Sequence, residues 1–389
     1  MPWLSFSFPF VTSVFSMRFL PSPHPEKTKL PNYKIGVVGT GFIVEECHLL
    51  AYQKAGFEVC GLVGRNLEKT RRIAEKYLIP WVGSNVIDLL EETKPSILDI
   101  AVPPLIQPAV IETAVGSNHL KGILAQKPLA LSFVEAERLV NLCGQSGKVL
   151  AVNQNMRFDP SVYALKQLID RGILGEPVLA TIEMRAVPHW MEWAKGMRSL
   201  STWIMSIHHL DTFRFWLGTP DRVFASFRQD PRTKFDHRDG ISLYILEYDG
   251  GARASGWDDV WAGPVKEGCA PSSEIRWRFE GTRGIAKGTI GWPDWPKHTP
   301  SVLEYTCLDF PGEWIRPAWD ATWFPDAFQY PMMDLMNAIE TNRNPISGGR
   351  ENLETIALLE AIYESGTTQK IAFPKEWLKK SARNSESYK

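Results

Sequence analysis

The sequence lacks the charge and cysteine patterns that mark nucleic-acid-binding, disulfide-rich and zinc-binding proteins. Its 43 Lys and Arg residues balance 44 Asp and Glu residues, so the formal net charge is -1, and no basic block stands out. We therefore expect no nucleic-acid partner. The five cysteines are scattered and form no CxxC pair, which indicates neither a disulfide framework nor a metal site. A reducing, cytoplasmic location fits this usage. The cysteines are Cys47, Cys60, Cys143, Cys269 and Cys307.

A hydrophobic run of membrane-spanning length is also missing. Residues 1–30 begin with an apolar stretch, but Pro9 interrupts it and no early positive charge precedes it. The stretch is too short and broken for a membrane span and makes a poor secretory signal. We expect no membrane association. We interpret residues 1–30 as a leader outside the fold, either disordered or an over-long start with translation beginning at Met17.

The remaining totals are those of a globular protein with two domains. The chain has 389 residues, of which 44% are hydrophobic and 22% are charged. The pattern of elements places a first domain at residues 31–155. A second domain with C-terminal helices follows at residues 156–374, and residues 375–389 form a tail.

The stretch from Tyr33 to Gly64 predicts a unit that binds a dinucleotide. A β-rich run, Lys34–Val38, leads into Gly39-Thr40-Gly41, an amphipathic segment and a second apolar strand, Val59–Val63. Such a strand, glycine turn, helix and strand hold a pyrophosphate against the helix N-terminus. Val44 stands where a GxGxxG motif has its third glycine, so an ordinary turn with two glycines is the alternative.

Helical and strand signals alternate as far as Asn153. Alternating strands and helices imply right-handed crossovers and a doubly wound parallel sheet. Helix starts are expected at Asn66 and at Ser132, which has Glu135 three residues on. The expected strands are Lys34–Val38, Val59–Val63, Ser96–Val102, Gly122–Ala125 and Val149–Asn153.

The order of predicted elements changes in the second half of the chain, where strands follow one another without helices between them. Glycine turns between consecutive strands predict an open, mostly antiparallel sheet in an α+β domain. An open sheet commonly covers its exposed face with a partner, so we expect a homodimer or homotetramer. Two helices, Ala327–Thr341 and Glu351–Tyr363, close the chain. The expected strands are Val178–Arg185, Arg222–Arg228, Ile241–Tyr248, Ala252–Trp257, Glu274–Glu280 and Ile285–Ile290.

Taken in order, several segments resemble the family of glucose–fructose oxidoreductase, inositol dehydrogenase and their relatives (Gfo/Idh/MocA). The resemblance runs from Tyr33 to about Pro374 and implies a Rossmann-type oxidoreductase that passes hydride between a nicotinamide and a sugar, polyol or related compound. It implies a dinucleotide-binding domain at residues 31–155 and a substrate and oligomerisation domain at residues 156–374. The segments are VVGTGFIVEECH, Pro103-Pro104, QKP, NQNMRFDP, IHHLDTFRFWLG, WFPDAF and NPISGGRENLETIALLEA.

Lys127 is the first expected catalytic residue. It lies just past the end of a parallel strand, where open α/β sheets bind ligands. The resemblance implies that this lysine contacts the substrate oxygen that gains or loses a proton. An ammonium suits that task because its pKa falls when it is desolvated. Gln126 replaces the glutamate of the family pattern and removes a charge beside the nicotinamide site.

His208 is the second expected catalytic residue, on the polar face of an apolar helix. The resemblance implies a general acid/base, supported by an aspartate four residues earlier, but this chain has Ile204 there. Asp211 is a candidate to orient His208, or else a partner in a helix salt bridge. His209 is either a substrate contact or a packing histidine.

The end of the second strand predicts which cofactor is preferred. It reads Gly64-Arg65-Asn66 and carries no carboxylate for a ribose 2′-hydroxyl. A guanidinium matches a 2′-phosphate, so NADP(H) is favoured over NAD(H). The expected cofactor-binding residues are Gly39, Thr40, Gly41, Phe42, Ile43, Gly64, Arg65, Val102, Pro103, Gln126, Lys127 and Asn155.

Substrate contacts are expected from Arg157, His189 and His209, because amides, imidazoles and nearby tryptophans suit polyhydroxylated ligands. Asp258 and Asp259 are adjacent in a strand and point to opposite faces, which excludes a glycosidase-like carboxylate pair. The expected function is an NADP(H)-dependent sugar or polyol oxidoreductase. The alternatives are a non-catalytic regulator of the same fold and a redox-neutral, nicotinamide-using glycosidase.

Overall fold

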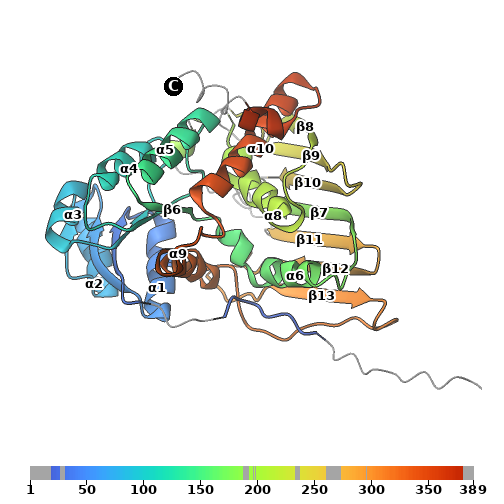
Figure 1. Ribbon diagram of the computed structural model, residues 1–389, viewed down its shortest axis with the longest axis horizontal. Helices are drawn as coiled ribbons and strands as arrows, with labels where there is room; N and C mark the ends of the chain where they lie inside the picture. The colour runs from blue at the N-terminus through green and yellow to red at the C-terminus, as the bar shows by residue number, and fades with distance from the viewer. Residues whose placement is uncertain are drawn as a thin grey trace, which may run out of the picture.

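The computed structural model describes most of the chain, namely residues 19–26, 31–186, 192–195, 197, 199–232, 237–259, 273–294 and 296–379. It contains a parallel sheet and a mixed sheet side by side, with helices packed around and between them (Figure 1). The predicted fold class, a Rossmann-type domain followed by an α+β domain with an open sheet, is confirmed.

The first sheet has six parallel strands in the order β3-β2-β1-β4-β5-β6. Successive strands are added on one side of β1 up to β3 and on its other side from β4 onward. In sheets of this type, ligands bind where the strand order changes sides, at the carboxyl ends of the strands. The two-residue β3 was not predicted, because so short a strand has no periodic pattern. The strands are β1 (Lys34–Val38), β2 (Glu58–Val63), β3 (Val82–Gly83), β4 (Ile97–Ile100), β5 (Gly122–Ala125) and β6 (Val149–Val152).

Side-chain caps begin two of the helices around this sheet as predicted. The Asn66 side chain accepts the Lys69 N–H at 3.0 Å, and the Ser132 hydroxyl accepts the Glu135 N–H at 3.3 Å. The first helix opens with a π-helical turn, η1 (Val44–His48). The helices are α1 (Leu49–Ala55), α2 (Leu67–Tyr77), α3 (Val86–Thr93), α4 (Gln107–Val115) and α5 (Phe133–Gln145).

The second sheet has seven strands in the order β13-β12-β11-β7-β10-β9-β8. Its neighbours pair antiparallel except for β7 and β10, which are parallel. The edge strand β13 was not predicted. The strands are β7 (Pro177–Arg185), β8 (Arg222–Arg228), β9 (Ile241–Glu247), β10 (Arg253–Asp259), β11 (Glu274–Gly281), β12 (Gly284–Thr289) and β13 (Val302–Cys307).

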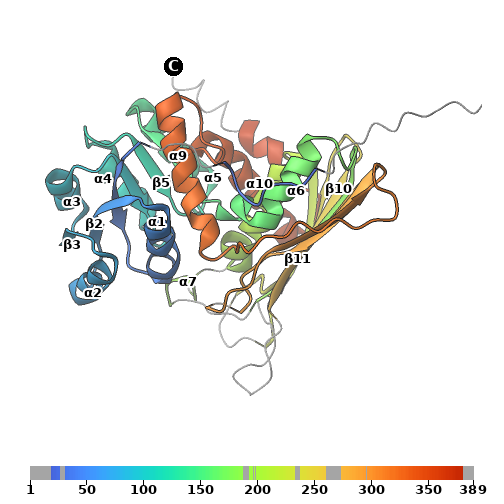
Figure 2. The ribbon, with the colours of Figure 1, turned by 90° about the horizontal axis from the view of Figure 1, so that it is seen from below.

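Helices pack on the face of the second sheet that is turned toward the first sheet (Figure 2). The helix expected to carry His208 is present, but the turn before it, η3, is π-helical. The elements in contact with this sheet are α6 (Pro160–Asp170), η3 (Thr202–Ser206), α8 (Ile207–Leu217) and α10 (Gly349–Thr368). Two further short elements are η2 (Asn155–Phe158), before α6, and α7 (Glu192–Lys195), before η3.

The last two helices connect the sheets. After the turn η5 (Asp326–Phe328), helix α9 (Gln329–Thr341) packs on β5 and β6, and Leu335 joins a core cluster with Ile35 of β1. Helix α10 lies between α5 and β8. Helix α9 therefore belongs to the expected 156–374 segment in sequence but completes the core of the first domain.

Part of the expected leader is folded, which corrects the assignment of residues 1–30 to a segment outside the fold. The guanidinium of Arg171 lies 4.2 Å from the ring centroid of Phe19, and the Gln167 amide donates to Ser22 O at 2.7 Å. His24 stacks on Tyr330 at 4.6 Å between ring centroids. Residues 19–26 thus pack against α6 and α9. In the part of the chain that the structure describes, no helix is long and apolar enough to cross a membrane.

The packing of α9 predicts a large loss of stability when Leu335 is shortened. Leu335 is fully buried, so Leu335→Ala leaves a cavity and should lower the free energy of unfolding by roughly 2–5 kcal/mol. Leu308→Ala is the control, because Leu308 is 63% exposed and its truncation should cost less than about 0.5 kcal/mol. Urea unfolding of both variants measures the difference. Equal losses would contradict the place of α9 in the core.

Candidate active site

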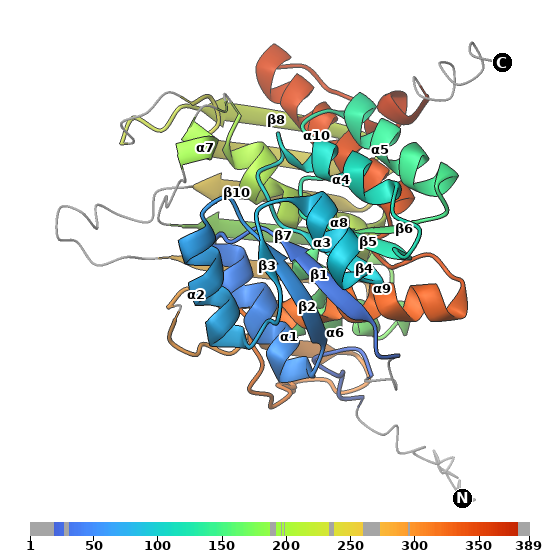
Figure 3. The same ribbon diagram turned by 90° about the vertical axis from the view of Figure 1, so that its left-hand side faces the viewer.

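The glycine turn lies at the carboxyl end of β1, where the first helix begins (Figure 3). Gly39 has φ +127°, and a Cβ there would lie 2.3 Å from Ala101 O, so the position requires glycine. At Gly41, the position of a Cβ has no described atom within 4 Å. A Cβ on Gly64 would meet the Thr40 methyl group at 2.5 Å, so the end of β2 packs against the turn.

This turn fits a dinucleotide. The first N–H groups of a helix have no intrahelical acceptor and favour a pyrophosphate, and the open space in front of Gly41 lets phosphates approach the backbone. Phe42 is exposed and Ile43 is partly exposed beside it. Val44, at the third position of the motif, is fully buried and packs behind Gly39. Its substitution for glycine therefore leaves the phosphate side of the turn open.

Lys127 follows β5 at the same edge of the sheet. Its ammonium donates a hydrogen bond of 2.6 Å to the backbone carbonyl of Ile204, in the π-helical turn before α8. Burial lowers the pKa of Lys127 from 10.5 to about 7, and among the described residues no carboxylate pairs with the ammonium. The carbonyl of Ile204, not its side chain, therefore meets the lysine. An amine that titrates near neutral pH can both give and take a proton.

His208 lies at the start of α8 and is buried. Burial and the nearby charges of Lys127 and His209 hold its pKa well below 6.5, so the imidazole is neutral at neutral pH. Its ring meets Trp323 edge-on at 5.2 Å between centroids, and its Nδ1 has no hydrogen-bond partner in the described residues. No ion pair joins His208 to a carboxylate among those residues. As Ile204 led us to expect, the histidine lacks the carboxylate of an acid/base dyad, and the charge of Lys127 is near enough to His208 to influence its pKa.

His209 is fully buried and contacts the second sheet through Asp258 of β10. Its Nδ1 lies 2.8 Å from Asp258 Oδ1, and the other carboxylate oxygen of Asp258 accepts from the Ser206 hydroxyl. Asp259, the next residue of β10, pairs instead with Arg232, which confirms that the two aspartates face opposite sides. With no exposed surface, His209 takes the packing role rather than the expected substrate contact.

Arg157 holds the structure together and is not free to bind substrate, which corrects its expected role. Its guanidinium donates two hydrogen bonds, of 2.6 and 2.7 Å, to the Asp211 carboxylate and others to Ile346 O and Glu351. Asp211 also accepts from the Thr355 hydroxyl at 2.7 Å. Asp211 therefore orients Arg157, not His208. The buried pair joins η2 to α8 and α10.

The amides at the strand ends are held by neighbours. Gln126 follows β5 and accepts the Lys127 N–H at 2.9 Å, and Gln107 binds the backbone of the same turn. Asn155 accepts the Trp323 indole N–H at 2.8 Å. Sequence analysis missed Trp323, although it lies in the WFPDAF segment. Val102 and Pro103, expected at the cofactor, follow β4 at this edge with partly exposed side chains.

Arg65 follows β2 and extends into solvent. It makes no hydrogen bond or ion pair within the described residues, and Lys69, one helical turn later on α2, is likewise unpaired there. Two unpaired cations beside the glycine turn are available to an anionic group.

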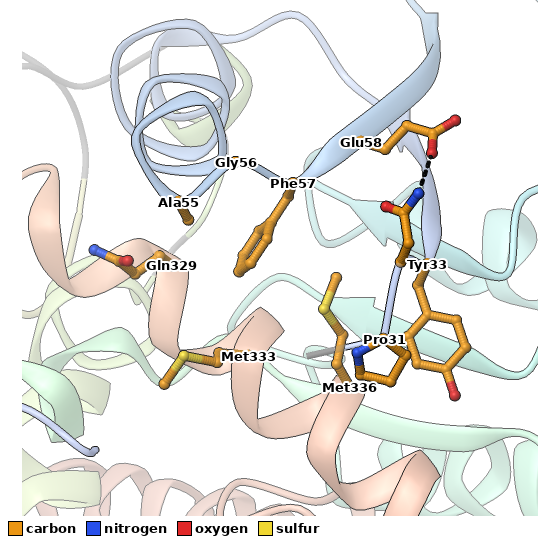
Figure 4. Close-up of a pocket in the computed structure, with 10 residues that line it drawn as sticks. Pro31, Tyr33, Ala55, Gly56, Phe57, Glu58, Gln329, Met333 and Met336 are labelled. Atoms are coloured by element: carbon orange, nitrogen blue, oxygen red, sulfur yellow. Dashed lines mark hydrogen bonds between the residues drawn. The ribbon is translucent and has the colours of Figure 1, made fainter. Parts of the chain in front are cut away.

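His189, an expected substrate contact, lies outside the described residues. Trp257 is on the face of the second sheet opposite Asp258, where the Arg185 guanidinium lies 4.5 Å from its ring. A cavity of about 280 Å³ opens at the amino ends of β1 and β2, lined by Tyr33, Phe57 and Met333 among others (Figure 4). This cavity is at the opposite end of the strands from the glycine turn.

Comparison with known proteins agrees with this geometry. An oxidoreductase family matches twice: its model of an NAD-binding Rossmann fold matches residues 33–154, and its model of a C-terminal alpha/beta domain matches residues 166–372. The chain is 22% identical over 346 residues to D-apiose dehydrogenase of Paraburkholderia graminis, covering 87% of this chain and 88% of that protein. It is 23% identical over 341 residues to D-xylose 1-dehydrogenase (NADP(+)) 2 of Haloferax volcanii, covering 86% and 97%.

The fold is also shared with solved structures. An oxidoreductase from Agrobacterium radiobacter, in complex with NAD+, L-tartaric acid and magnesium, superposes with a TM-score of 0.76 at 20% identity. The superposition covers 89% of this chain and 99% of that one. At this identity the likeness shows the fold alone.

The environment of Lys127 predicts how stability changes with pH. Its pKa is about 7 in the folded chain against about 10.5 when unfolded, so the unfolded state binds more protons between these values. The burial cost is complete below pH 7 and is relieved as the pH rises toward 10.5. Relative to Lys127→Met, the wild type should therefore gain stability across this window, by at most ~1.4 kcal/mol per pH unit. Urea unfolding at several pH values measures this difference, and a flat difference would contradict the lowered pKa.

Proposed function

The chain belongs to the Gfo/Idh/MocA family of NAD(P)-dependent oxidoreductases, and we propose that it oxidises an alcohol, or reduces the corresponding carbonyl, of a sugar or polyol with NADP(H) as the preferred cofactor. The observation that carries this proposal is a buried lysine with a pKa of about 7 beside a neutral histidine, at the carboxyl edge of the dinucleotide-binding sheet. The sugar-dehydrogenase names of its relatives support a carbohydrate-like substrate.

The side chains divide the chemistry between them. A bound nicotinamide dinucleotide supplies the hydride acceptor or donor. Lys127 exists as both ammonium and amine near neutral pH, so it gives a proton to the substrate oxygen during reduction and takes one during oxidation. His208 stays uncharged, and its Nδ1 offers a hydrogen bond to a substrate hydroxyl. Proton transfer therefore falls to Lys127, while His208 orients the substrate.

The preference for NADP(H) rests on Arg65 and Lys69. Both cations are unpaired within the described residues and follow β2, where a dinucleotide's adenosine ribose lies in this fold. The 2′-phosphate of NADP(H) would form ion pairs with both side chains. NAD(H) has no such phosphate and would leave both cations without a partner. The relative from Haloferax volcanii is named for NADP(+), which supports the same choice.

A homo-oligomer formed through the second sheet is part of the proposal. Helices α6, α8 and α10 pack on one face of this sheet (Figure 2). On the other face, Phe224 is the register partner of Ile245 across β8 and β9, and Leu243 lies two residues from Ile245. All three side chains are exposed. An apolar patch of this kind is typical of a surface that another subunit covers.

Replacing Lys127 tests the catalytic assignment. Lys127→Ala should lower kcat by at least about 10²-fold, because it removes the proton donor and acceptor, while NADPH binding is unchanged. Turnover is followed as the change in nicotinamide absorbance with a panel of aldoses, ketoses and polyols that includes D-apiose and D-xylose, and binding is followed by NADPH fluorescence. Lys121→Ala is the matched control, since Lys121 immediately precedes β5 at its opposite end.

Two results would contradict the proposal in different ways. Undiminished turnover by Lys127→Ala would remove the lysine from the mechanism. A wild type that binds NADPH but consumes none with any substrate of the panel would favour the regulator. Product formation without a net change in NADPH would instead favour redox-neutral chemistry.

Replacing Arg65 tests the cofactor preference. Arg65→Ala should raise the Kd for NADPH by about 10-fold or more, as expected for a lost hydrogen bond to a charged group, and leave the Kd for NADH unchanged. Arg283→Ala is the control, because Arg283 is an exposed arginine in the turn between β11 and β12, remote from the glycine turn. Equal effects of Arg65→Ala on both cofactors would argue against contact with the 2′-phosphate.

A further inference from the structure

A polar network is buried inside the first sheet, beneath the edge where Lys127 lies. Asp99, in the middle of β4, has no exposed surface. One of its carboxylate oxygens, Oδ2, lies 2.7 Å from Nδ1 of His48 and accepts the Tyr52 hydroxyl at 2.8 Å. His48 and Tyr52 reach the same carboxylate because they are four residues apart and share one face of the first helix. The π-helical turn η1 ends at His48.

The far side of the imidazole faces two carboxamides. His48 Nε2 lies 3.0 Å from the Asn153 side-chain nitrogen and 3.4 Å from the Gln126 side-chain nitrogen. The orientation of Gln126 is settled by its other end, because its oxygen accepts the Lys127 backbone N–H at 2.9 Å. Its nitrogen must therefore be the atom that faces His48.

These contacts select one tautomer of His48. Amide nitrogens are donors, so Nε2 must present its lone pair to Gln126 and Asn153. The ring hydrogen then sits on Nδ1 and donates to Asp99. Exchanging the oxygen and nitrogen of the Asn153 amide would place its oxygen against Nε2. The same exchange in Gln126 would break the hydrogen bond that its oxygen accepts from the Lys127 N–H. A continuous chain of hydrogen bonds thus runs from Asp99 through His48 and Gln126 to the backbone of Lys127.

We propose that Asp99 and His48 are positioning residues for the nicotinamide half of the cofactor site. Asp99 fixes the tautomer of His48, and His48 holds the Gln126 and Asn153 carboxamides at the carboxyl ends of β5 and β6. This inference rests on the proposed function, because it assigns the amides to a nicotinamide site. It explains why a strand of otherwise apolar residues, ILDI, carries a buried carboxylate.

A change of one atom in Asp99 tests the assignment. In Asp99→Asn a neutral amide oxygen replaces the charged acceptor of the His48 Nδ1 hydrogen, so the imidazole and the two carboxamides beyond it are held less firmly. We expect the Kd for NADPH to rise about 10-fold, as for the loss of one good hydrogen bond.

Tyr52→Phe is the matched control, because it removes a donor to the same carboxylate but leaves the chain from Asp99 to Lys127 intact. It should lower the melting temperature without changing the Kd for NADPH. If the network served stability alone, Asp99→Asn and Tyr52→Phe would both lower the melting temperature and leave the Kd unchanged. That result would overturn the proposal.

The tautomer itself is measurable without cofactor. The ¹⁵N chemical shifts of the His48 ring, assigned by comparison with His48→Gln, should show hydrogen on Nδ1 in the wild type. Hydrogen on Nε2 instead would break the hydrogen-bond chain at Gln126 and overturn the proposal, even if Asp99→Asn weakened cofactor binding. If the wild type bound no nicotinamide cofactor, the proposed function would fail, whereas the shifts would still report the hydrogen-bond chain.

Discussion

An ammonium group that leaves water without a counter-ion pays a desolvation cost, and Lys127 occupies such a position. Its hydrogen-bond acceptor is the carbonyl of Ile204, a dipole rather than a charge, so the charged form is stabilised only in part. A carboxylate in contact with the ammonium would restore a high pKa and keep the lysine protonated at neutral pH. Contact with a backbone carbonyl alone therefore leaves the site with a proton carrier that titrates near neutral pH.

Local patterns predicted most of the fold and part of this site. The glycine turn, the capped helices and the end of β5 before Lys127 each depend on residues close in sequence, where propensity and spacing are informative. The Lys127–Ile204 bond joins residues 77 positions apart through a backbone carbonyl, which no side-chain motif records. The Arg157–Asp211 pair was misread for a similar reason. A polar residue near a strand end resembles a ligand contact in sequence, because its partners in the folded chain are distant in sequence.

Buried polar groups are the other part that sequence alone did not predict. Asp99 lies in an apolar strand, and Asp258 alternates inward on β10 to meet His209. Each is costly without a partner, so each indicates a second residue that must come from elsewhere in the fold. In both cases the partner is a histidine on a helix beginning with a π-helical turn. Such turns shift the side chains that follow them around the helix axis, and they recur next to functional sites.

The place of α9 has a consequence for how the chain reaches its folded state. The face of the first sheet near Ile35 is closed by Leu335, which is synthesised about 300 residues later. A nascent chain that has emerged only as far as β6 therefore exposes that face to water or to other chains. The dinucleotide-binding domain is synthesised first, but its core is complete only when α9 has been synthesised. During synthesis this apolar face is exposed until α9 has emerged, and exposed apolar surface on a nascent chain is what chaperones bind.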